Sequence, residues 1–361
     1  MNTLSLCMIV KNEEQTIARC LESAVVFADE IIIVDTGSSD NTKRIARRFT
    51  RHIYDFNWID NFSAARNYAF SFATSDLVMW LDADDVVPQE EARKIALLKQ
   101  RLDDTVHCVM LKYDIAFDLN GKPTFSYYRE RIIRRSAPHI WREPVHEYLE
   151  CAGKSITEDI HIEHRKIKSN EPGRNKRIYE SILKKGGELS VRGLYYYARE
   201  LHENSEYAKA IKYYNKFLDT KKGWVEDNIG ACTGIAQCYR TLGDDKKELE
   251  YYLKSFQYEL PRAEQCCGIA YHYKNLKDYK KAAFWFELAL RLEKPKGRAG
   301  FIREECWGYV PSIELAVCYS MMGEMDIARK YNEKAGEFKP GDPSVDRNRK
   351  FFEARKRFEN I

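Results

Sequence analysis

The sequence contains no run of about 18 consecutive apolar residues, the length that an α-helix needs to cross a bilayer. Its first residues, MNTLSLCMIVKNEE, lack the basic start, the long apolar stretch and the cleavage site of a secretory signal. Its ten cysteines show neither CxxC pairs nor Cys/His metal spacing, and they are too sparse for a disulfide scaffold. We therefore expect a cytoplasmic protein with reduced cysteines and no membrane span.

The sequence has no large excess of either positive or negative charge. The 59 lysines and arginines nearly balance the 55 aspartates and glutamates, which leaves a formal net charge of +4. In the second half of the chain, lysine and tyrosine follow the positions of a repeat and form no continuous basic face. We therefore expect no nucleic-acid partner.

Short apolar runs alternate with stretches of helical spacing over the first hundred residues. These runs are 4–10, 30–35, 52–54 and 77–81. Such β-α-β-α alternation predicts a Rossmann-like, mostly parallel sheet with helices on both faces. In open sheets of this kind, ligands bind beyond the carboxyl ends of the strands. Polar turns follow three of the runs, at 11–14, 35–39 and 82–85.

The second half of the chain repeats itself instead. Residues Ala236 and Tyr252, for example, recur 34 residues later as Ala270 and Phe286. A 34-residue period with small and aromatic positions resembles the tetratricopeptide repeat, a helix-turn-helix unit. We expect about four repeats stacked into an all-α solenoid. The predicted domains are 1–165 and 191–361, with a linker at 166–190.

The turn Asp82-Ala83-Asp84-Asp85 follows the fourth apolar run. Two carboxylates spaced as Asp-x-Asp at the end of a strand present hard oxygen donors to one divalent cation, and Mg²⁺ takes one or two carboxylates plus substrate phosphates. Acidic loops are common, and most are merely solvated. The apolar strand that precedes the turn at 82–85, together with the two earlier polar strand ends, favours a binding site here.

The three strand ends together resemble the family 2 glycosyltransferases, which have the α/β GT-A fold. The matching segments are LSLCMIVKNEE, EIIIVDTGSSDNT and FSAARNYAFSFATSDLVMWLDADD. The resemblance is close over residues 1 to about 90 and looser to about 165. It implies a GT-A domain that uses a UDP-sugar and Mg²⁺ or Mn²⁺, followed by the repeat domain.

The resemblance also implies roles for individual residues. The donor-binding positions of the family correspond here to Val10, Lys11, Asn12, Glu13, Asp35, Ser38, Arg66, Asn67, Asp82 and Ala83. Within this set, Asp82 would hold the metal together with Asp84, and Arg66 would neutralise phosphate charge. Position 36 is Thr where many members carry a second Asp, which weakens the base-recognition argument. The alternatives are that Asp35 and Ser38 cap the next helix and that Arg66 pairs with a surface carboxylate.

The acceptor side depends on the segment at 141–147, WREPVHE. An inverting transfer needs a base that deprotonates the acceptor, and we choose Glu147 first and His146 second. A surface salt bridge or a satisfied histidine is the alternative. Some GT-A enzymes use a late histidine as a metal ligand, and the Ile-x-His pattern favours His164 over His161. The arginines at 129, 131, 134 and 135 are expected to lie on a solvated strand, and the alternative is that they contact the diphosphate or the acceptor.

Relatives with this architecture include bacteriocin glycosyltransferases of the sublancin type, which modify Cys or Ser of a peptide. The resemblance therefore implies an inverting, metal-dependent transfer to a peptide or protein acceptor, with a homodimer formed through the repeats. One alternative is a glucosyltransferase acting on lipooligosaccharide or another glycan. The alternative from another class is a repeat scaffold with an inactive sugar-nucleotide-binding domain, although intact Asn12, Arg66, Asp82 and Asp84 speak against it.

Overall fold

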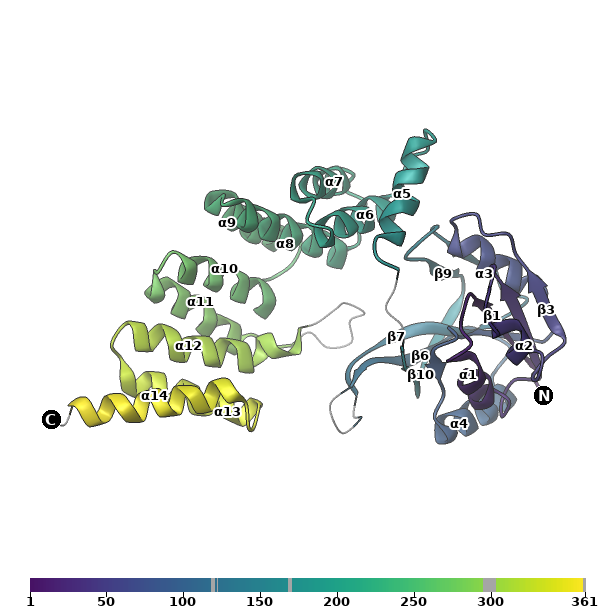
Figure 1. The fold of residues 1–361 in the computed structure, drawn as a ribbon, viewed down its shortest axis with the longest axis horizontal. Helices are drawn as coiled ribbons and strands as arrows, with labels where there is room; N and C mark the ends of the chain where they lie inside the picture. The colour runs from purple at the N-terminus through teal and green to yellow at the C-terminus, as the bar shows by residue number, and fades with distance from the viewer. Residues whose placement is uncertain (118–120, 122, 168–170, 295–302, 360–361) are drawn as a thin grey trace. The chain divides into compact units, whose positions relative to one another are not determined.

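The chain, described by a computed structural model over residues 1–117, 121, 123–167, 171–294 and 303–359, folds into two compact units. The first unit is Met1–Gly187 and the second is Glu188–Ile361. The first contains strands and helices, and the second contains helices (Figure 1).

The first unit alternates strands and helices and then continues with two long strands. Its elements are, in chain order, β1 (Leu4–Val10), α1 (Ile17–Ala24), β2 (Glu30–Asp35), α2 (Thr42–Ala46), β3 (His52–Asp55), α3 (Phe62–Phe70), β4 (Leu77–Trp80), β5 (Asp85–Val86), α4 (Gln89–Arg101), β6 (Val106–Phe117), β7 (Pro123–Arg134), β8 (His139–Arg142), β9 (Tyr148–Cys151), β10 (Lys154–His164) and α5 (Arg174–Lys184). The four apolar runs predicted as strands are thus confirmed, with the third and fourth differing by one residue at their ends.

Eight strands form one mixed sheet in the order β3-β2-β1-β4-β7-β6-β10-β5. Strand β1 is parallel to β2 and β4, β2 is parallel to β3, and β10 is parallel to β6. Strand β7 is antiparallel to both of its neighbours, and β8 and β9 form a separate two-stranded sheet. Because β1, β2 and β4 run in one direction, their carboxyl ends meet at one edge. The predicted α/β class is confirmed.

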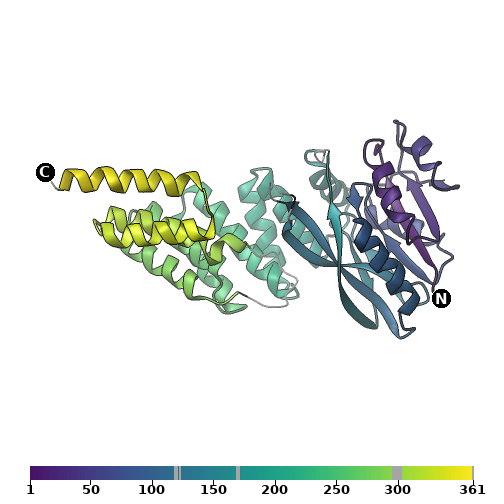
Figure 2. The ribbon, with the colours of Figure 1, turned by 90° about the horizontal axis from the view of Figure 1, so that it is seen from below.

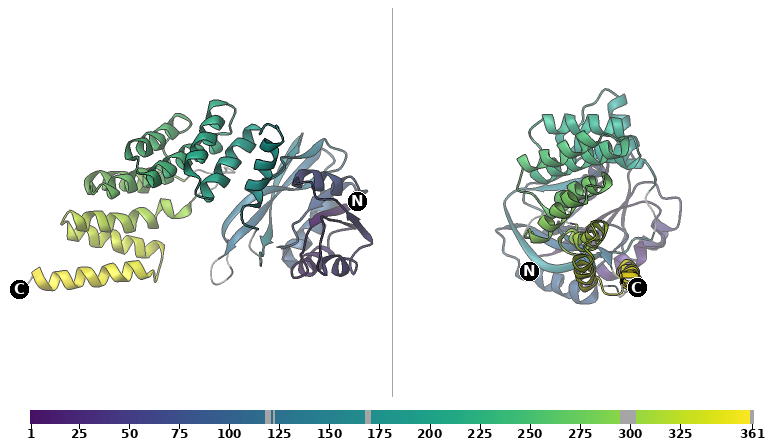
Figure 3. Two further views of the ribbon diagram at one scale, coloured as in Figure 1. Left: turned by 45° about the horizontal axis from the view of Figure 1, so that its top comes forward. Right: turned by 90° about the vertical axis from the view of Figure 1, so that its left-hand side faces the viewer.

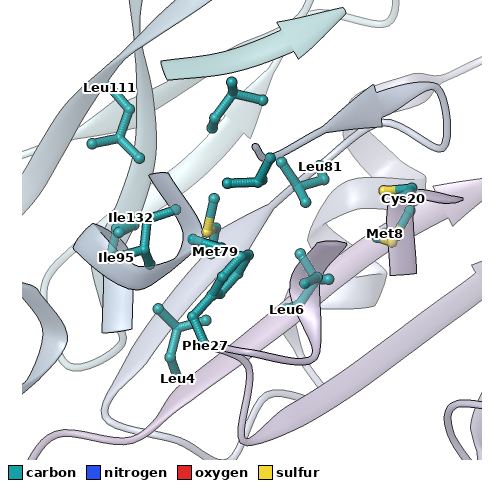
Figure 4. Close-up of a cluster of buried hydrophobic side chains, with 14 of the residues drawn as sticks. Leu4, Leu6, Met8, Cys20, Phe27, Met79, Leu81, Ile95, Leu111 and Ile132 are labelled. Carbon is teal, nitrogen blue, oxygen red and sulfur yellow. The ribbon is translucent and has the colours of Figure 1, made fainter. Parts of the chain in front are cut away.

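Alternating side chains of β1 fix the two faces of the sheet. Residues Leu4, Leu6 and Met8 belong to a core with α1 and α4, where they lie near Phe27 and Met79 (Figure 4). The opposite face packs against α3 and the β8–β9 pair, and Figure 2 shows the twisted sheet of this unit from below. Full burial of such a side chain contributes about 1.5–3 kcal/mol. A register slip of one residue would exchange the faces, so packing fixes where each strand ends.

The second unit is a series of antiparallel helix pairs (Figure 3). Its elements are α6 (Val191–Glu203), α7 (Tyr207–Asp219), α8 (Val225–Leu242), α9 (Asp245–Lys254), the 3-10 turn η1 (Ser255–Gln257), α10 (Ala263–Asn275), α11 (Tyr279–Arg291), the 3-10 turn η2 (Glu304–Trp307), α12 (Tyr309–Met321), α13 (Met325–Phe338) and α14 (Pro343–Glu359). A fully buried alanine recurs in the first helix of each of the four pairs, at Ala198, Ala236, Ala270 and Ala316. Small residues let neighbouring helices approach closely, and the predicted all-α solenoid is confirmed.

The segment predicted as a linker contains helix α5, while its residues 168–170 lie outside the described part of the chain. Residues Ile178 and Tyr179 of α5 are buried, and the hydroxyl of Tyr179 donates to the carbonyl oxygen of Val145 at 3.4 Å. Helix α5 therefore packs within the first unit. All ten cysteines are free thiols. Among the described helices, none is long and apolar enough to span a bilayer.

Candidate functional site

A cavity of about 420 Å³ opens beyond the carboxyl ends of β1 and β4, and we call it the strand-end cavity. Ten of the residues singled out from the sequence line it: Val10, Lys11, Glu13, Arg66, Asp82, Ala83, Asp84, His146, Glu147 and His164. These residues come from segments up to 154 positions apart, from Val10 to His164. The other four, Asn12, Asp35, Ser38 and Asn67, are not among the lining residues.

Arg66 is the bridge between two carboxylates of the cavity. Its Nη2 donates to Asp82 Oδ1 at 2.8 Å, and its Nε donates to Glu147 Oε1 at 2.9 Å. The guanidinium also lies over the rings of Trp80 and Trp141, 4.8 and 4.7 Å from their centroids. Burial alone would lower the pKa of Arg66, but the charges of Asp82 and Glu147 outweigh it and raise the pKa. The planar group is thus held by stacking and by two ion pairs.

Helix α3 presents Arg66 because its N-terminus is fixed. The Asn61 side chain accepts a hydrogen bond from the Ala64 amide at 2.9 Å, which caps the helix. One turn further on, both ends of the Asn67 amide bind the backbone of Trp141, at 3.0 and 2.9 Å. Asn67 therefore holds in place one of the two rings that stack on Arg66.

A second group of polar side chains follows β4. The Nδ1 atom of His164 lies 3.5 Å from Asp84 Oδ1 and 3.2 Å from Asp85 Oδ1. One ligand atom from each of these three residues lies within 4.8 Å of the other two, as a shared metal requires. His161 instead lies 2.7 Å from Asp114, outside this group.

The carboxyls of Asp82 and Asp84 differ in their pKa. Burial would raise the pKa of Asp82, but the cations Arg66 and Arg131 lower it to about 2. Burial, together with the nearby charges of Asp82 and Asp85, raises the pKa of Asp84 to about 6, although His164 opposes the rise. For His164, burial is opposed by the neighbouring aspartates, and its pKa is raised. Asp84 therefore takes up a proton more readily than Asp82.

The sequence predicts no role for Asp85, the last residue of this acidic turn. It is completely buried, and its Oδ2 accepts from Arg131 at 3.0 Å and from the Asp82 amide at 3.0 Å. Its Oδ1 accepts from the Tyr113 hydroxyl at 2.7 Å. Arg131 is also completely buried and stacks on Trp80 at 3.7 Å. The expectation of a solvated strand is therefore wrong for Arg131, and it is wrong for the buried Arg134 as well. Asp85 therefore anchors the loop that carries Asp82 and Asp84.

The turn after β2 is built around Asp35. Its Oδ1 accepts from the amides of Gly37 and Ser38 at 2.9 and 2.8 Å. Its Oδ2 is buried without a hydrogen-bond partner among the described residues. The N-cap of α2 is Asn41, so the alternative that Asp35 or Ser38 caps this helix is wrong. The Ser38 hydroxyl accepts from the Asn12 amide at 2.9 Å, which joins the two strand ends.

The segment that carries Glu147 and His146 is held by α3. The amide of Phe62 donates to the Pro144 carbonyl at 2.8 Å, and the Ser63 hydroxyl donates to the Glu143 carbonyl. Both Glu143 and His146 adopt left-handed backbone conformations, with φ of 72° and 55°. Such conformations persist only where the surroundings fix them. This fixed turn brings Glu147 to Arg66.

Sequence reasoning missed several lining residues. Among them are Phe62 and three residues near the start of α5: Lys166, Arg174 and Asn175. The Arg174 guanidinium lies 4.7 Å from the Phe62 ring centroid. Lys166 and Arg174 add two cationic side chains to the lining of the cavity, as an anionic ligand requires. The basic composition of 166–190 was the signal for Lys166, Arg174 and Asn175. The prediction of a linker over this segment obscured it.

Comparison with known proteins gives matches in both units of the chain. Residues 5–152 match the model of glycosyl transferase family 2, and residues 263–295 match a tetratricopeptide repeat. A TPR repeat-containing protein of Synechococcus elongatus is 34% identical over 151 residues, which are 42% of this chain and 36% of that protein. The SPbeta prophage-derived glycosyltransferase SunS of Bacillus subtilis is 26% identical over 72% of this chain and 64% of its own length. The chain thus spans between about a third and two thirds of these relatives.

Among solved structures, the chain is similar to a complex of glucosyl-3-phosphoglycerate synthase from Mycobacterium tuberculosis with Mn²⁺, uridine diphosphate and phosphoglyceric acid. The identity is 19%, the TM-score is 0.28, and the match covers 31% of this chain and 43% of that one.

Proposed function

Since the chain carries a family 2 glycosyl transferase domain followed by tetratricopeptide repeats, we propose that it is a metal-dependent, inverting glycosyltransferase. It moves a sugar from a UDP-sugar to a Cys or Ser side chain of a peptide or protein. The observation that carries the proposal is the convergence of Asp82, Asp84 and His164 with Arg66 and Glu147 in one cavity.

The chemistry of the donor set suits a divalent cation, while the three residues whose ligand atoms lie within 4.8 Å of one another are Asp84, Asp85 and His164. Asp82 and Asp84 offer hard carboxylate oxygens, and His164 adds a nitrogen, a set that suits Mn²⁺ or Mg²⁺. Asp85 is committed to Arg131 and Tyr113, so we assign it to support and not to ligation. When bound, such a cation neutralises the diphosphate of the leaving group. Burial and the charges of Asp82 and Asp85 disfavour the ionised form of Asp84, and a bound cation would favour it.

The remaining residues would bind the nucleotide. Lys11, Lys166 and Arg174 line the cavity and supply positive charge for the diphosphate. Asp35 Oδ2 is buried without a partner among the described residues, so a donor group of the base or ribose would satisfy it. Arg66 already pairs with Asp82 and Glu147, so its contribution to phosphate binding requires that one of these pairs opens.

Glu147 is the proposed base. It takes the proton of the acceptor hydroxyl or thiol while that oxygen or sulfur attacks the anomeric carbon, and the bond from this carbon to the diphosphate breaks in the same displacement. Arg66 orients the carboxylate through its Oε1. His146 lines the same cavity and is the second candidate.

The acceptor assignment rests on the second unit. Stacked helical repeats offer an extended surface to a peptide or to a second copy of the chain, and a lipid-linked acceptor does not need one. A homodimer through the repeats is part of the proposal.

The experiment is a screen of UDP-sugar hydrolysis with and without Mn²⁺, because hydrolysis needs no acceptor. We expect the wild type to release UDP only when Mn²⁺ is present. The Asp84→Ala variant should release no UDP, and the Asp159→Ala variant should release UDP as the wild type does. Asp159 is a matched control because it is exposed and does not line the cavity. Absence of turnover with every UDP-sugar tested would favour the inactive scaffold. Transfer to lipooligosaccharide in place of peptides would favour the glycan alternative.

A further inference from the structure

The second unit holds its own group of potential metal ligands, at the interface of α9 and α10. Asp245 and Glu248 lie one turn apart on α9, and His272 lies on α10. One ligand atom of each lies within 4.8 Å of the other two. Glu248 and His272 are buried, with 1% and 3% exposure, while Asp245 is exposed. We call this group the repeat cluster.

A buried carboxylate oxygen of the repeat cluster lacks a partner. Glu248 Oε2 lies 2.8 Å from His272 Nδ1. Glu248 Oε1 is buried and has no hydrogen-bond partner among the described residues. Buried polar atoms nearly always have a hydrogen-bond partner. A charged carboxylate oxygen without a partner costs more free energy than a neutral polar atom without one. A hydrogen-bonded His–Glu pair therefore does not fully account for the group, and a cation would supply the missing partner.

The repeats themselves provide an internal comparison. The three positions of the repeat cluster correspond, at the α7–α8 interface, to Tyr207, Ala210 and Cys238, and at the α11–α12 interface to Tyr279, Ala282 and Cys318. Both of those interfaces thus use the same three residue types, with the alanine and the cysteine fully buried. At α9–α10, all three are replaced together by Asp, Glu and His. Packing at these interfaces requires only the buried alanine and cysteine. The joint replacement of all three residues by potential metal ligands therefore indicates a binding role.

We propose that the repeat cluster is a second, structural metal site that binds a divalent transition metal of the Zn²⁺ class. An imidazole nitrogen and two carboxylate oxygens suit Zn²⁺, with a water as the fourth ligand. Zinc ligands lie about 2.0–2.2 Å from the metal, so in a tetrahedron they are about 3.4 Å apart. The exposed Asp245 side chain closes onto an ion already held by the buried pair. The site would fasten the second repeat to the third.

The test is equilibrium dialysis of the full-length protein against Zn²⁺, with the bound metal counted by mass spectrometry. An Asp84→Ala background removes binding at the strand-end cavity. In this background we expect one bound Zn²⁺. The triple variant Asp245→Tyr/Glu248→Ala/His272→Cys recreates the residues of the other two interfaces, so it should fold, and it should lose this ion.

Asp245→Asn is the milder variant, since an exposed residue contributes little to folding. We expect its Zn²⁺ affinity to fall by about tenfold or more, while the matched control Asp326→Asn, in the first turn of α13, keeps the affinity of the parent. Zn²⁺ should raise the thermal midpoint of the parent and not that of the triple variant. Equal Zn²⁺ binding by parent and triple variant, or no Zn²⁺ on the folded parent, would overturn the proposal and leave a His–Glu ion pair only.

Discussion

Each of the two units gathers two carboxylates and a histidine, but the two groups are built differently. Asp84 and His164 line the strand-end cavity, and the third member of this group, Asp85, is buried beside them. The repeat cluster lies inside a helix–helix interface, with two of its three residues buried. Side chains that line an open cavity can bind and release a substrate. Side chains enclosed in a helix–helix interface can bind an ion or stabilise the interface. Variants should separate these two roles.

The largest effect is expected for Glu147→Gln, which keeps the hydrogen bond to Arg66 but cannot accept a proton. Glycosyl transfer to a serine acceptor should fall by roughly 10²–10⁴-fold, while UDP-sugar affinity hardly changes. A thiol ionises near pH 8.5, so a cysteine acceptor should tolerate the variant better as pH rises. The measurement is the rate of peptide modification with each acceptor between about pH 6.5 and 9.

The matched control for this variant is Glu150→Gln, because Glu150 is half exposed and pairs with Arg142 outside the cavity. It should behave as wild type. If Glu147→Gln transfers to serine as fast as wild type at low pH, Glu147 is not the base and His146 becomes the candidate.

The next effect concerns stability. Asp85→Asn leaves the buried Arg131 without its counter-charge, which should cost about 3–5 kcal/mol of unfolding free energy. The exposed Asp245→Asn in the repeat cluster should change it by less than about 0.5 kcal/mol when no metal is present. Urea denaturation in a chelator measures both. Equal losses for the two variants would mean that burial does not distinguish the two groups.

A smaller effect is expected when residues 191–361 are deleted. The strand-end cavity lies in the first unit, so UDP-sugar hydrolysis should persist, while modification of a peptide acceptor falls by about tenfold or more because a docking surface is lost. Parallel assays of a soluble truncation test this. Equal loss of both activities in a folded truncation would contradict the division of labour between the units.

The smallest effect is a pH dependence of the second unit. Burial raises the pKa of Asp227 to about 6, although Arg192 and Arg199 oppose the rise. The folded state therefore binds a proton more readily than the unfolded one, and stability is lost as pH rises from about 4 to about 6. Asp227→Asn should remove this slope and add about 1–2 kcal/mol near neutral pH. Urea midpoints at about pH 4.5 and about pH 7.5 measure this pH dependence, and the exposed Asp219→Asn is the control. An unchanged slope in Asp227→Asn would show that Asp227 is not its cause.

Much of the fold could be predicted because the information is local. Apolar runs of the right length marked β1, β2, β3 and β4, and the 34-residue period marked the helix pairs. The later strands were not placed. Strand β7 inserts antiparallel between β4 and β6, and such a pairing depends on contacts between residues far apart in the chain. Helix α5 was missed because a basic, glycine-containing stretch resembles a linker.

The candidate site divides in the same way. The spacing of Asp82 and Asp84 is visible in the sequence, since both follow one strand. That Asp85 is buried against Arg131 is not visible, because it depends on the neighbouring strand β7. The same holds for the pairing of Arg66 with Glu147, whose contact spans 81 positions.

The sequence by itself determined where the strands end, how the repeats recur, and which residue types stand at the turns, because periodicity and turn chemistry are properties of neighbours in the chain. The tertiary structure alone decided which of those residues meet. It brought His164 to Asp84, Glu147 to Arg66 and His272 to Glu248. The physical reason is that sheet order, strand register and helix packing are set by the burial of the whole core, and no short segment contains that information.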